Sequence, residues 1–246
     1  MRVATQLILA AIVLLGGLTS VEAQGSNTKV TKNMLKVNGV KYRREKAEDA
    51  KVASMGVMRT PIGGVFHFEH KRNAPKAVEV PLETPVILEL RQLKTSDVAG
   101  MGSVKVLGTG EVSASAFAQG MRSGQYVLAK LKTKTAKYKD RINRNNRFLG
   151  QIRDQKPKDK VRIVTAVWVV ISADFSSQMQ AGISANASFK IAGNKLEFGG
   201  AARGSTATSV SWGQGTVFAY EVSKVTWTKK RAKIADLRAD LVGMLN

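Results

Sequence analysis

An alternation of apolar and polar residues over 175–212 constrains the fold more than any other feature of the chain. Within 175–191 the odd-numbered positions are apolar except for Ser177, and the even-numbered positions are small or polar. A period of two is typical of a β-strand with one apolar face and one wet face. The dipeptide Gly193-Asn194 is suited to a two-residue hairpin turn. The pattern therefore predicts two long antiparallel strands that meet at this turn.

A weaker form of the same pattern covers residues 103–135. Its apolar positions are mostly alanine and glycine, and the chain is interrupted at 120–124 before a second alternating run begins. Strands of soluble domains usually have about 5–6 residues, whereas about 9–11 residues suffice to cross a bilayer. The two segments therefore predict two unusually long amphipathic hairpins, 103–135 and 175–212.

The remaining segments predict the rest of an α+β, β-rich domain. Residues 122–162 hold 14 Lys or Arg against three Asp, and 138–154 mixes apolar residues with arginines, which indicates a basic helical connector. Residues 161–171 form a continuous apolar, β-branched run, as expected for a buried central strand. The end of the chain, 229–246, has the apolar spacing of an amphipathic helix. We expect a twisted, mostly antiparallel sheet that carries these elements.

The N-terminus has the features of a secretory signal peptide over residues 1–23. Arg2 gives a positive start, 7–18 is a short apolar run, and 21–23 is a small-x-small cleavage site. An uncleaved anchor is the alternative. The chain has no cysteine, and an exported chain without cysteine fits a bacterial periplasm or secretion route. We expect one β-rich domain over 24–228 that is periplasmic or secreted in a bacterium and associated with membranes.

Residue types that carry common catalytic chemistry are scarce. His67 and His70 are the only histidines, and residues three apart on a strand point to opposite faces, which disfavours a shared metal. A P-loop lysine, a thiol nucleophile and a Gly-x-Ser-x-Gly elbow are all missing from the sequence. No catalytic, cofactor or metal site is predicted, and the chain is not predicted to be an enzyme.

The formal net charge of +21 predicts an acidic partner. Nucleic acid is scarce outside the cell, so it is not the expected partner, and anionic lipid or another polyanion of the envelope is favoured. Part of the charge also serves solubility. The candidate contacts with anionic lipid are Lys41, Arg43, Arg44, Lys71, Arg72, Lys130, Lys132, Lys134, Arg141, Arg144 and Arg147.

The last third of the chain resembles the N-terminal pore-forming domain of the gasdermins. The similarity covers 161–227 and consists of the strand 163–167, the alternating hairpin, a Ser/Thr-rich strand, a glycine turn and the run 215–222. The resemblance implies hairpins that extend on the membrane into a large barrel once a covering segment is removed. It also implies that 229–246 is similar to the inhibitory tail of bacterial members. Gasdermins are usually cytosolic, and this chain differs in its predicted signal peptide.

Two interpretations of function follow. In the first, the protein binds anionic membranes and forms a homo-oligomeric pore through its hairpins, with their apolar faces in contact with lipid. In the second, it is a soluble periplasmic or secreted binding or assembly module of the envelope, because alternation is equally expected when one face packs on a core. The candidate membrane-insertion residues are Phe175, Met179, Ile183, Phe189, Ile191, Leu196, Phe198, Val210 and Trp212.

Overall fold

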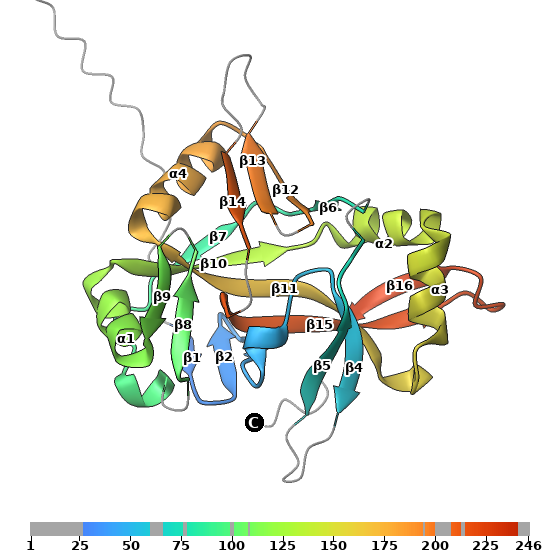
Figure 1. Ribbon diagram of the computed structural model, residues 1–246, viewed down its shortest axis with the longest axis horizontal. Helices are drawn as coiled ribbons and strands as arrows, with labels where there is room; N and C mark the ends of the chain where they lie inside the picture. Colours follow the sequence, from blue (N-terminus) through green and yellow to red (C-terminus); the bar gives the residue numbers. More distant parts are fainter. Residues whose placement is uncertain are drawn as a thin grey trace, which may run out of the picture.

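A central strand, β11 (Val161–Ser172), organises the structure (Figure 1). The computed structural model describes residues 27–59, 66–75, 78–98, 101–107, 109–193, 195–199, 208–212 and 215–240, and the predicted signal peptide lies outside them. Residues 161–171 are all buried, on both faces of the strand. The predicted buried central strand is therefore confirmed.

The main sheet curls around β11, and all of its strand pairs are antiparallel. β10 (Tyr126–Lys132) and β15 (Val217–Trp227) flank the central strand. Beyond β10 lies β7 (Val86–Leu88), and beyond β15 lie β3 (Val40–Arg43), β2 (Met34–Val37) and β1 (Thr28–Val30). The hairpin of β4 (Met55–Arg59) and β5 (His67–Arg72) pairs with the start of β11, and β16 (Ile234–Ala239) pairs with β15. The predicted α+β class with a mostly antiparallel sheet is confirmed.

The two faces of this sheet bury different cores. One core contains Trp168 and Phe218 and is covered by η2 (Thr95–Val98), β8 (Ser103–Val106), β9 (Gly110–Ser113) and α1 (Ala114–Ser123). The other core is covered by α2 (Thr135–Arg144), α3 (Asn146–Asp154) and a second, smaller sheet. Short 3-10 turns, η1 (Ala47–Asp49) and η3 (Lys158–Lys160), complete the chain. The predicted basic helical connector is confirmed as α2 and α3.

The second sheet has the order β14 (Thr208–Ser211), β13 (Lys195–Gly199), β12 (Ser188–Ala192) and β6 (Val80–Pro81). Helix α4 (Ala173–Ser184) leads from β11 into it, at the top of Figure 1. We call α4 together with β12, β13 and β14 the α4 module. Ala192 pairs with Lys195, so the predicted strands on either side of Gly193-Asn194 do pair as a hairpin.

The predicted length of the 175–212 hairpin is wrong for this structure. Its first ten residues belong to α4, which begins at the cap of Ser172, whose Oγ accepts from the Phe175 backbone N–H at 3.3 Å. Phe175, Met179 and Ile183 are four residues apart. That spacing keeps them on one face of a strand, but it also places them on one face of a helix. The alternation therefore could not distinguish the two structures here.

The predicted hairpin over 103–135 is also wrong. β8 and β9 form a short hairpin, the chain continues as α1, and β10 pairs with β7 and β11 instead. Ser113 caps α1 by accepting from the Ala116 N–H at 3.2 Å. Phe117 and Met121, four residues apart, are buried on the side that a strand would have turned to water. Alanine, the strongest helix former, supplies much of the segment.

The predicted C-terminal helix over 229–246 is wrong where the structure describes it. Residues 234–239 are the strand β16, which pairs with β15 across a turn closed by Thr228 N–H to Lys233 O at 3.0 Å. Residues 241–246 lie outside the described residues. The edge of β15 supplies backbone hydrogen-bond partners to β16. Only Ile234 and Leu237 of the helical pattern are buried, so this pairing outweighs the weak preference for a helix. The predicted boundary after residue 228 therefore falls inside a hairpin.

Both histidines lie on β5, and they predict a loss of stability in acid. Burial lowers the pKa of His67 and of His70 below the ordinary 6.5, and the nearby charges of Lys46 and Lys51 lower them further. The unfolded chain therefore takes up protons that the folded chain resists, so stability falls as the pH drops below about 6.5. Unfolding midpoints measured at about pH 7.5 and about pH 5.5 should differ more in the wild type than in the His67→Asn/His70→Asn variant. Equal differences would contradict this assignment.

Candidate anionic-membrane interface

Helices α2 and α3 carry their charges outward because each buries a narrow apolar stripe. α2 buries Tyr138 and Ile142, and α3 buries Phe148, Leu149 and Ile152. The Tyr138 hydroxyl donates to Ala53 O at 2.6 Å, which anchors α2 to the body of the protein. Asn145 Oδ1 accepts from the Phe148 N–H at 3.0 Å and so begins α3. The lysines and arginines between the apolar positions are left facing solvent.

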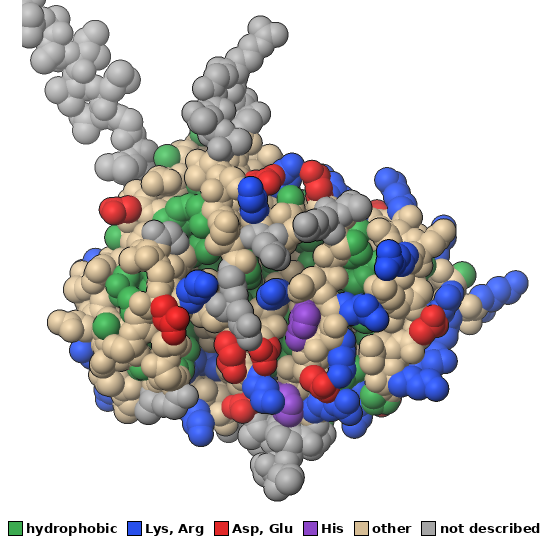
Figure 2. Space-filling view, in the orientation of Figure 1, with side chains coloured by type: hydrophobic (Ala, Val, Ile, Leu, Met, Phe, Trp, Pro, Cys, Tyr) green, Lys and Arg blue, Asp and Glu red, His purple; other side chains and the backbone are tan. Residues whose placement is uncertain are grey.

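The β15–β16 hairpin joins these helices in one surface. The Asn143 side chain donates to Ile234 O at 2.9 Å and accepts from the Ile234 N–H at 2.8 Å. Lys139 Nζ donates to Ala235 O at 3.3 Å. Figure 1 shows α2 and α3 beside β16, and in Figure 2 blue side chains are dense over the same end of the molecule. Asn143 and Ile234 are about 90 positions apart in the sequence. Their hydrogen bonds therefore bring the charges of two distant segments into one surface.

This surface has few counter-charges. Residues 134–160 hold ten Lys or Arg and three Asp, and 228–238 hold five Lys or Arg and one Asp. The ion pairs on it are Arg153–Asp154 and Arg238–Asp236, and Arg141 pairs with Glu79 at its border. Within the described residues, twelve further cations of these segments take part in no ion pair. Lys134 lies at the border beside β6 and Lys139 is half-buried, which leaves ten exposed cations. We call these ten the basic surface: Lys137, Arg144, Arg147, Lys156, Lys158, Lys160, Lys229, Lys230, Arg231 and Lys233.

A hollow opens beside α3, at the edge of the basic surface. It has a volume of about 610 Å³, and its wall includes three cations from β5, α3 and the segment after α3, namely Arg72, Arg147 and Lys156. The amides of Asn146, Gln151 and Gln155 and the carboxylate of Asp154 complete the wall. Guanidinium, ammonium and amide groups can donate hydrogen bonds to phosphate and hydroxyl oxygens. The hollow therefore has the chemistry expected for a phosphorylated headgroup.

The candidate lipid contacts fall into three groups. Lys71, Arg72, Lys134, Arg144 and Arg147 are exposed, as a lipid contact requires, although Lys71 is paired with Glu69. Four others are half-buried: Lys41, Lys130, Lys132 and Arg141. Lys130 lies over the ring of Tyr42, Lys132 pairs with Glu83, and Arg141 pairs with Glu79. The prediction is wrong for Arg43 and Arg44, which are 3 % and 7 % exposed.

Sequence reasoning missed the cations of the β15–β16 turn. Lys229, Lys230, Arg231 and Lys233 were assigned to a helix, whereas all four are exposed on the turn. A run of three basic residues directly after a strand that ends in Thr226-Trp227 is the signal that could have located them. Their contribution enlarges the basic surface beyond the helical connector.

The nine candidate insertion residues do lie together, but they face the protein interior. Phe198 stacks on Phe189 at a centroid distance of 5.4 Å and meets Phe175 edge-on at 5.9 Å. Met179, Ile191, Leu196 and Trp212 are buried in the same core, and Ile183 and Val210 are partly buried against it. The predicted apolar face of β12, β13 and β14 is therefore real, and in this structure its partner is α4 and the main sheet.

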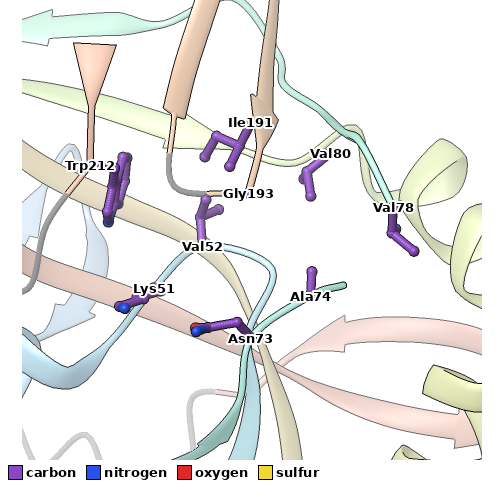
Figure 3. Close-up of a pocket in the computed structure, with 9 residues that line it drawn as sticks. All are labelled: Lys51, Val52, Asn73, Ala74, Val78, Val80, Ile191, Gly193 and Trp212. Atoms are coloured by element: carbon purple, nitrogen blue, oxygen red, sulfur yellow. The ribbon is translucent and has the colours of Figure 1, made fainter. Parts of the chain in front are cut away.

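The α4 module meets the β4–β5 end of the main sheet across an imperfectly packed boundary. Figure 3 shows Trp212, Gly193 and Ile191 on the module side, and Lys51, Asn73 and Ala74 opposite. The small cavity between them measures about 20 Å³, room for about one water molecule. Within the described residues Trp212 Nε1, which is buried there, has no hydrogen-bond partner, and an unpaired buried donor costs free energy. This boundary is therefore weaker than a fully packed core.

None of the helices in the described part of the chain has both the length and the apolar character needed to span a bilayer. The described residues also contain no group of three or more His, Cys, Asp or Glu arranged to hold a metal ion. No family model, no curated protein and no solved structure matches the chain. The candidate site therefore stands on its geometry and charge.

Proposed function

We propose that this protein binds anionic membrane surfaces through the basic surface. The observation that carries the proposal is the set of ten exposed cations without ion-pair partners, held on one side by α2, α3, η3 and the β15–β16 turn. Each Lys or Arg near an anionic bilayer contributes about 1 kcal/mol. A handful of these ten cations is sufficient for stable association. Phosphate groups of lipid or lipopolysaccharide are the expected contacts, and the hollow beside α3 is the expected place for a headgroup.

Cosedimentation with vesicles tests this proposal. The protein should pellet with vesicles that contain phosphatidylglycerol and stay in solution with pure phosphatidylcholine. Exposed charges are screened over about 10 Å at 0.1 M salt, so binding should weaken steeply between about 0.05 M and about 0.5 M salt. Equal binding to both kinds of vesicle, or binding that does not change with salt, would contradict a headgroup interaction.

One observation favours a second function, pore formation. Residues 175–191 keep the alternation of a membrane-crossing strand, yet the first part of the segment is the helix α4. That helix contains Ser176, Ser177, Gly182 and Ser184, which are poor helix formers, and it buries only Phe175, Ser176 and Met179. A change of α4 to extended structure would lengthen the β12–β13 hairpin enough to cross a bilayer. The resemblance to the gasdermin pore-forming domain supports the same change.

Pore formation requires the α4 module to leave the main sheet. Its apolar residues would exchange the present core for acyl chains, and its Ser, Gln and Asn side chains would face water. Neighbouring copies would have to pair their strands, because an unpaired strand edge is not tolerated in lipid. The imperfectly packed boundary around Trp212 is the place where separation is expected to begin. If the module never separates, the protein is a binding or assembly module of the envelope without pore activity.

A further inference from the structure

Arg44, the residue after β3, is a buried cation that takes part in no ion pair with the described part of the chain. Its Nη1 donates to the backbone oxygens of Thr31 and Asp97, the latter at 2.7 Å, and its Nη2 lies 3.1 Å from Met101 Sδ. The guanidinium carbon is 4.3 Å from the centre of the Phe218 ring. Among the described residues no carboxylate forms an ion pair with Arg44, and its Nε has no hydrogen-bond partner.

Buried charges in proteins are normally paired, and the same molecule offers the comparison. Arg162 is also buried, and its Nε donates to the carboxylate of Asp240. The charge of Asp97 raises the pKa of Arg44, but the Oδ2 of this carboxylate accepts from the Lys94 N–H at 2.9 Å. Desolvation lowers the pKa of Arg44 to about 10, so the group is still charged at neutral pH. A buried cation outside an ion pair carries a desolvation cost, which an anionic ligand would offset.

Arg44 lies in the wall of a hollow of about 580 Å³ that opens to solvent. The hollow runs between η1, the start of β8 and the start of β15, away from α2 and α3. Its apolar wall comes from Met101, Val217 and Phe218. Its charged and polar lining consists of Lys32, Lys46, Ser103, Glu45 and Glu48.

We propose that this hollow binds a small amphiphilic molecule with one oxyanion head, a phosphate ester or a carboxylate. The head pairs with Arg44 and with the ammonium groups of Lys32 and Lys46, and the apolar part lies on Met101 and Phe218. The carboxylates of Glu45 and Glu48 also line the hollow and repel anions, so the head must bind on the side of the three cations. The site is distinct from the basic surface, because the two share no residue.

Gly102 provides a way to close the hollow without touching Arg44. It lines the hollow, and a side chain at this position would meet no atom within 4 Å. Gly102→Phe should therefore fill the space, whereas Gly102→Ala leaves most of it open. Arg44→Lys keeps the charge but loses the planar fork that contacts Thr31 and Asp97. Comparison of these three variants shows whether binding depends on free space in the hollow, on the guanidinium geometry of Arg44, or only on a positive charge.

The probes are hexyl phosphate, hexanoate and inorganic phosphate, and the measurement is isothermal titration of the whole protein. Hexyl phosphate should bind the wild type and Gly102→Ala alike. It should bind Gly102→Phe, whose side chain occupies the space, and Arg44→Lys, which lacks the planar fork, at least about tenfold more weakly. Inorganic phosphate should bind more weakly than hexyl phosphate, because it has no apolar part.

Two further arms identify the source of the ligand and the independence of the site. Binding of phosphatidic acid vesicles that falls in Gly102→Phe would identify the ligand as a lipid headgroup, and vesicle binding unaffected by it would identify a free small molecule. An Arg144→Gln/Arg147→Gln/Lys230→Gln variant should still bind hexyl phosphate, even if vesicle binding is lost. The proposal is overturned if no probe binds at millimolar concentration, or if Gly102→Phe, folded as judged by its unfolding midpoint, binds them as the wild type does.

Discussion

Replacement of Asp240 by alanine is expected to lower the free energy of unfolding by about 3–5 kcal/mol. The Asp240 side chain is 6 % exposed, and its carboxylate accepts from Arg162 Nε in the buried end of the β11–β15–β16 sheet. The charge of Asp240 also favours the ionised form of the neighbouring Arg43, whose pKa is otherwise lowered by burial. Without the carboxylate, the buried Arg162 guanidinium loses the charge that its Nε contacts, and Asp240 no longer offsets the repulsion between Arg162 and Arg43. Urea unfolding followed by circular dichroism measures the loss.

Two companion variants test the cause of this effect. Asp236→Ala removes a carboxylate of β16, the strand that precedes Asp240; it is largely exposed and paired with Arg238 at 2.9 Å, and its loss should change stability little. The double variant Asp240→Leu/Arg162→Met replaces the buried pair with apolar groups and should recover most of the loss. If Asp240→Ala is as stable as Asp236→Ala, the buried pair does not stabilise the end of the sheet.

A disulfide between positions 81 and 190 is expected to reduce vesicle dye release to background. Lys190 on β12 faces Pro81 on β6, next to the pair in which Leu82 N–H donates to Phe189 O at 2.9 Å. Such a non-hydrogen-bonded pair has a Cα–Cα distance of about 4.5 Å, within the range of a disulfide. Pro81 is itself bonded to the body, because its O accepts from Lys134 N–H at 2.8 Å. The cross-link would therefore hold the β12–β13 hairpin in place.

The chain has no cysteine of its own, so Pro81→Cys/Lys190→Cys forms one defined bond. Dye release should return on reduction, and each single-cysteine variant should release dye under both conditions. Vesicle binding should be the same in the oxidised and reduced forms, because the basic surface is untouched. Full release from the oxidised form would exclude movement of the α4 module as the step that opens the pore. If the wild type releases no dye at all, the protein binds membranes without forming pores.

The sequence predicts those elements whose pattern admits only one structure. Residues 161–171 are too continuously apolar to be anything but buried, and β11 is buried on both faces. Gly193-Asn194 predicts a two-residue loop between two strands, and β12 and β13 pair up to Ala192 and Lys195 on either side of it. The arginines among apolar residues at 138–154 predict surface helices, and α2 and α3 carry them.

Two failures have a common physical origin in tertiary contacts. Phe175, Met179 and Ile183 satisfy both a strand and a helix, and only packing of α4 on β13 and the main sheet decides between them. Arg43 and Arg44 look like any exposed cation in sequence. They are buried because Asp240, 197 positions from Arg43, and Asp97, 53 positions from Arg44, supply backbone oxygens. A local sequence pattern contains no information about a hydrogen-bond partner so far away in the sequence.

We expect membrane binding to depend on the basic surface and not on the total charge of the protein. Two triple variants with equal net charge test it: Arg144→Gln/Arg147→Gln/Lys230→Gln on the basic surface, and Lys29→Gln/Lys94→Gln/Lys105→Gln elsewhere. All six side chains are exposed, and none of them takes part in an ion pair within the described residues. At about 1 kcal/mol for each cation, affinity for phosphatidylglycerol vesicles should fall roughly 100-fold in the first variant and little in the second. An equal fall in both variants would contradict the claim.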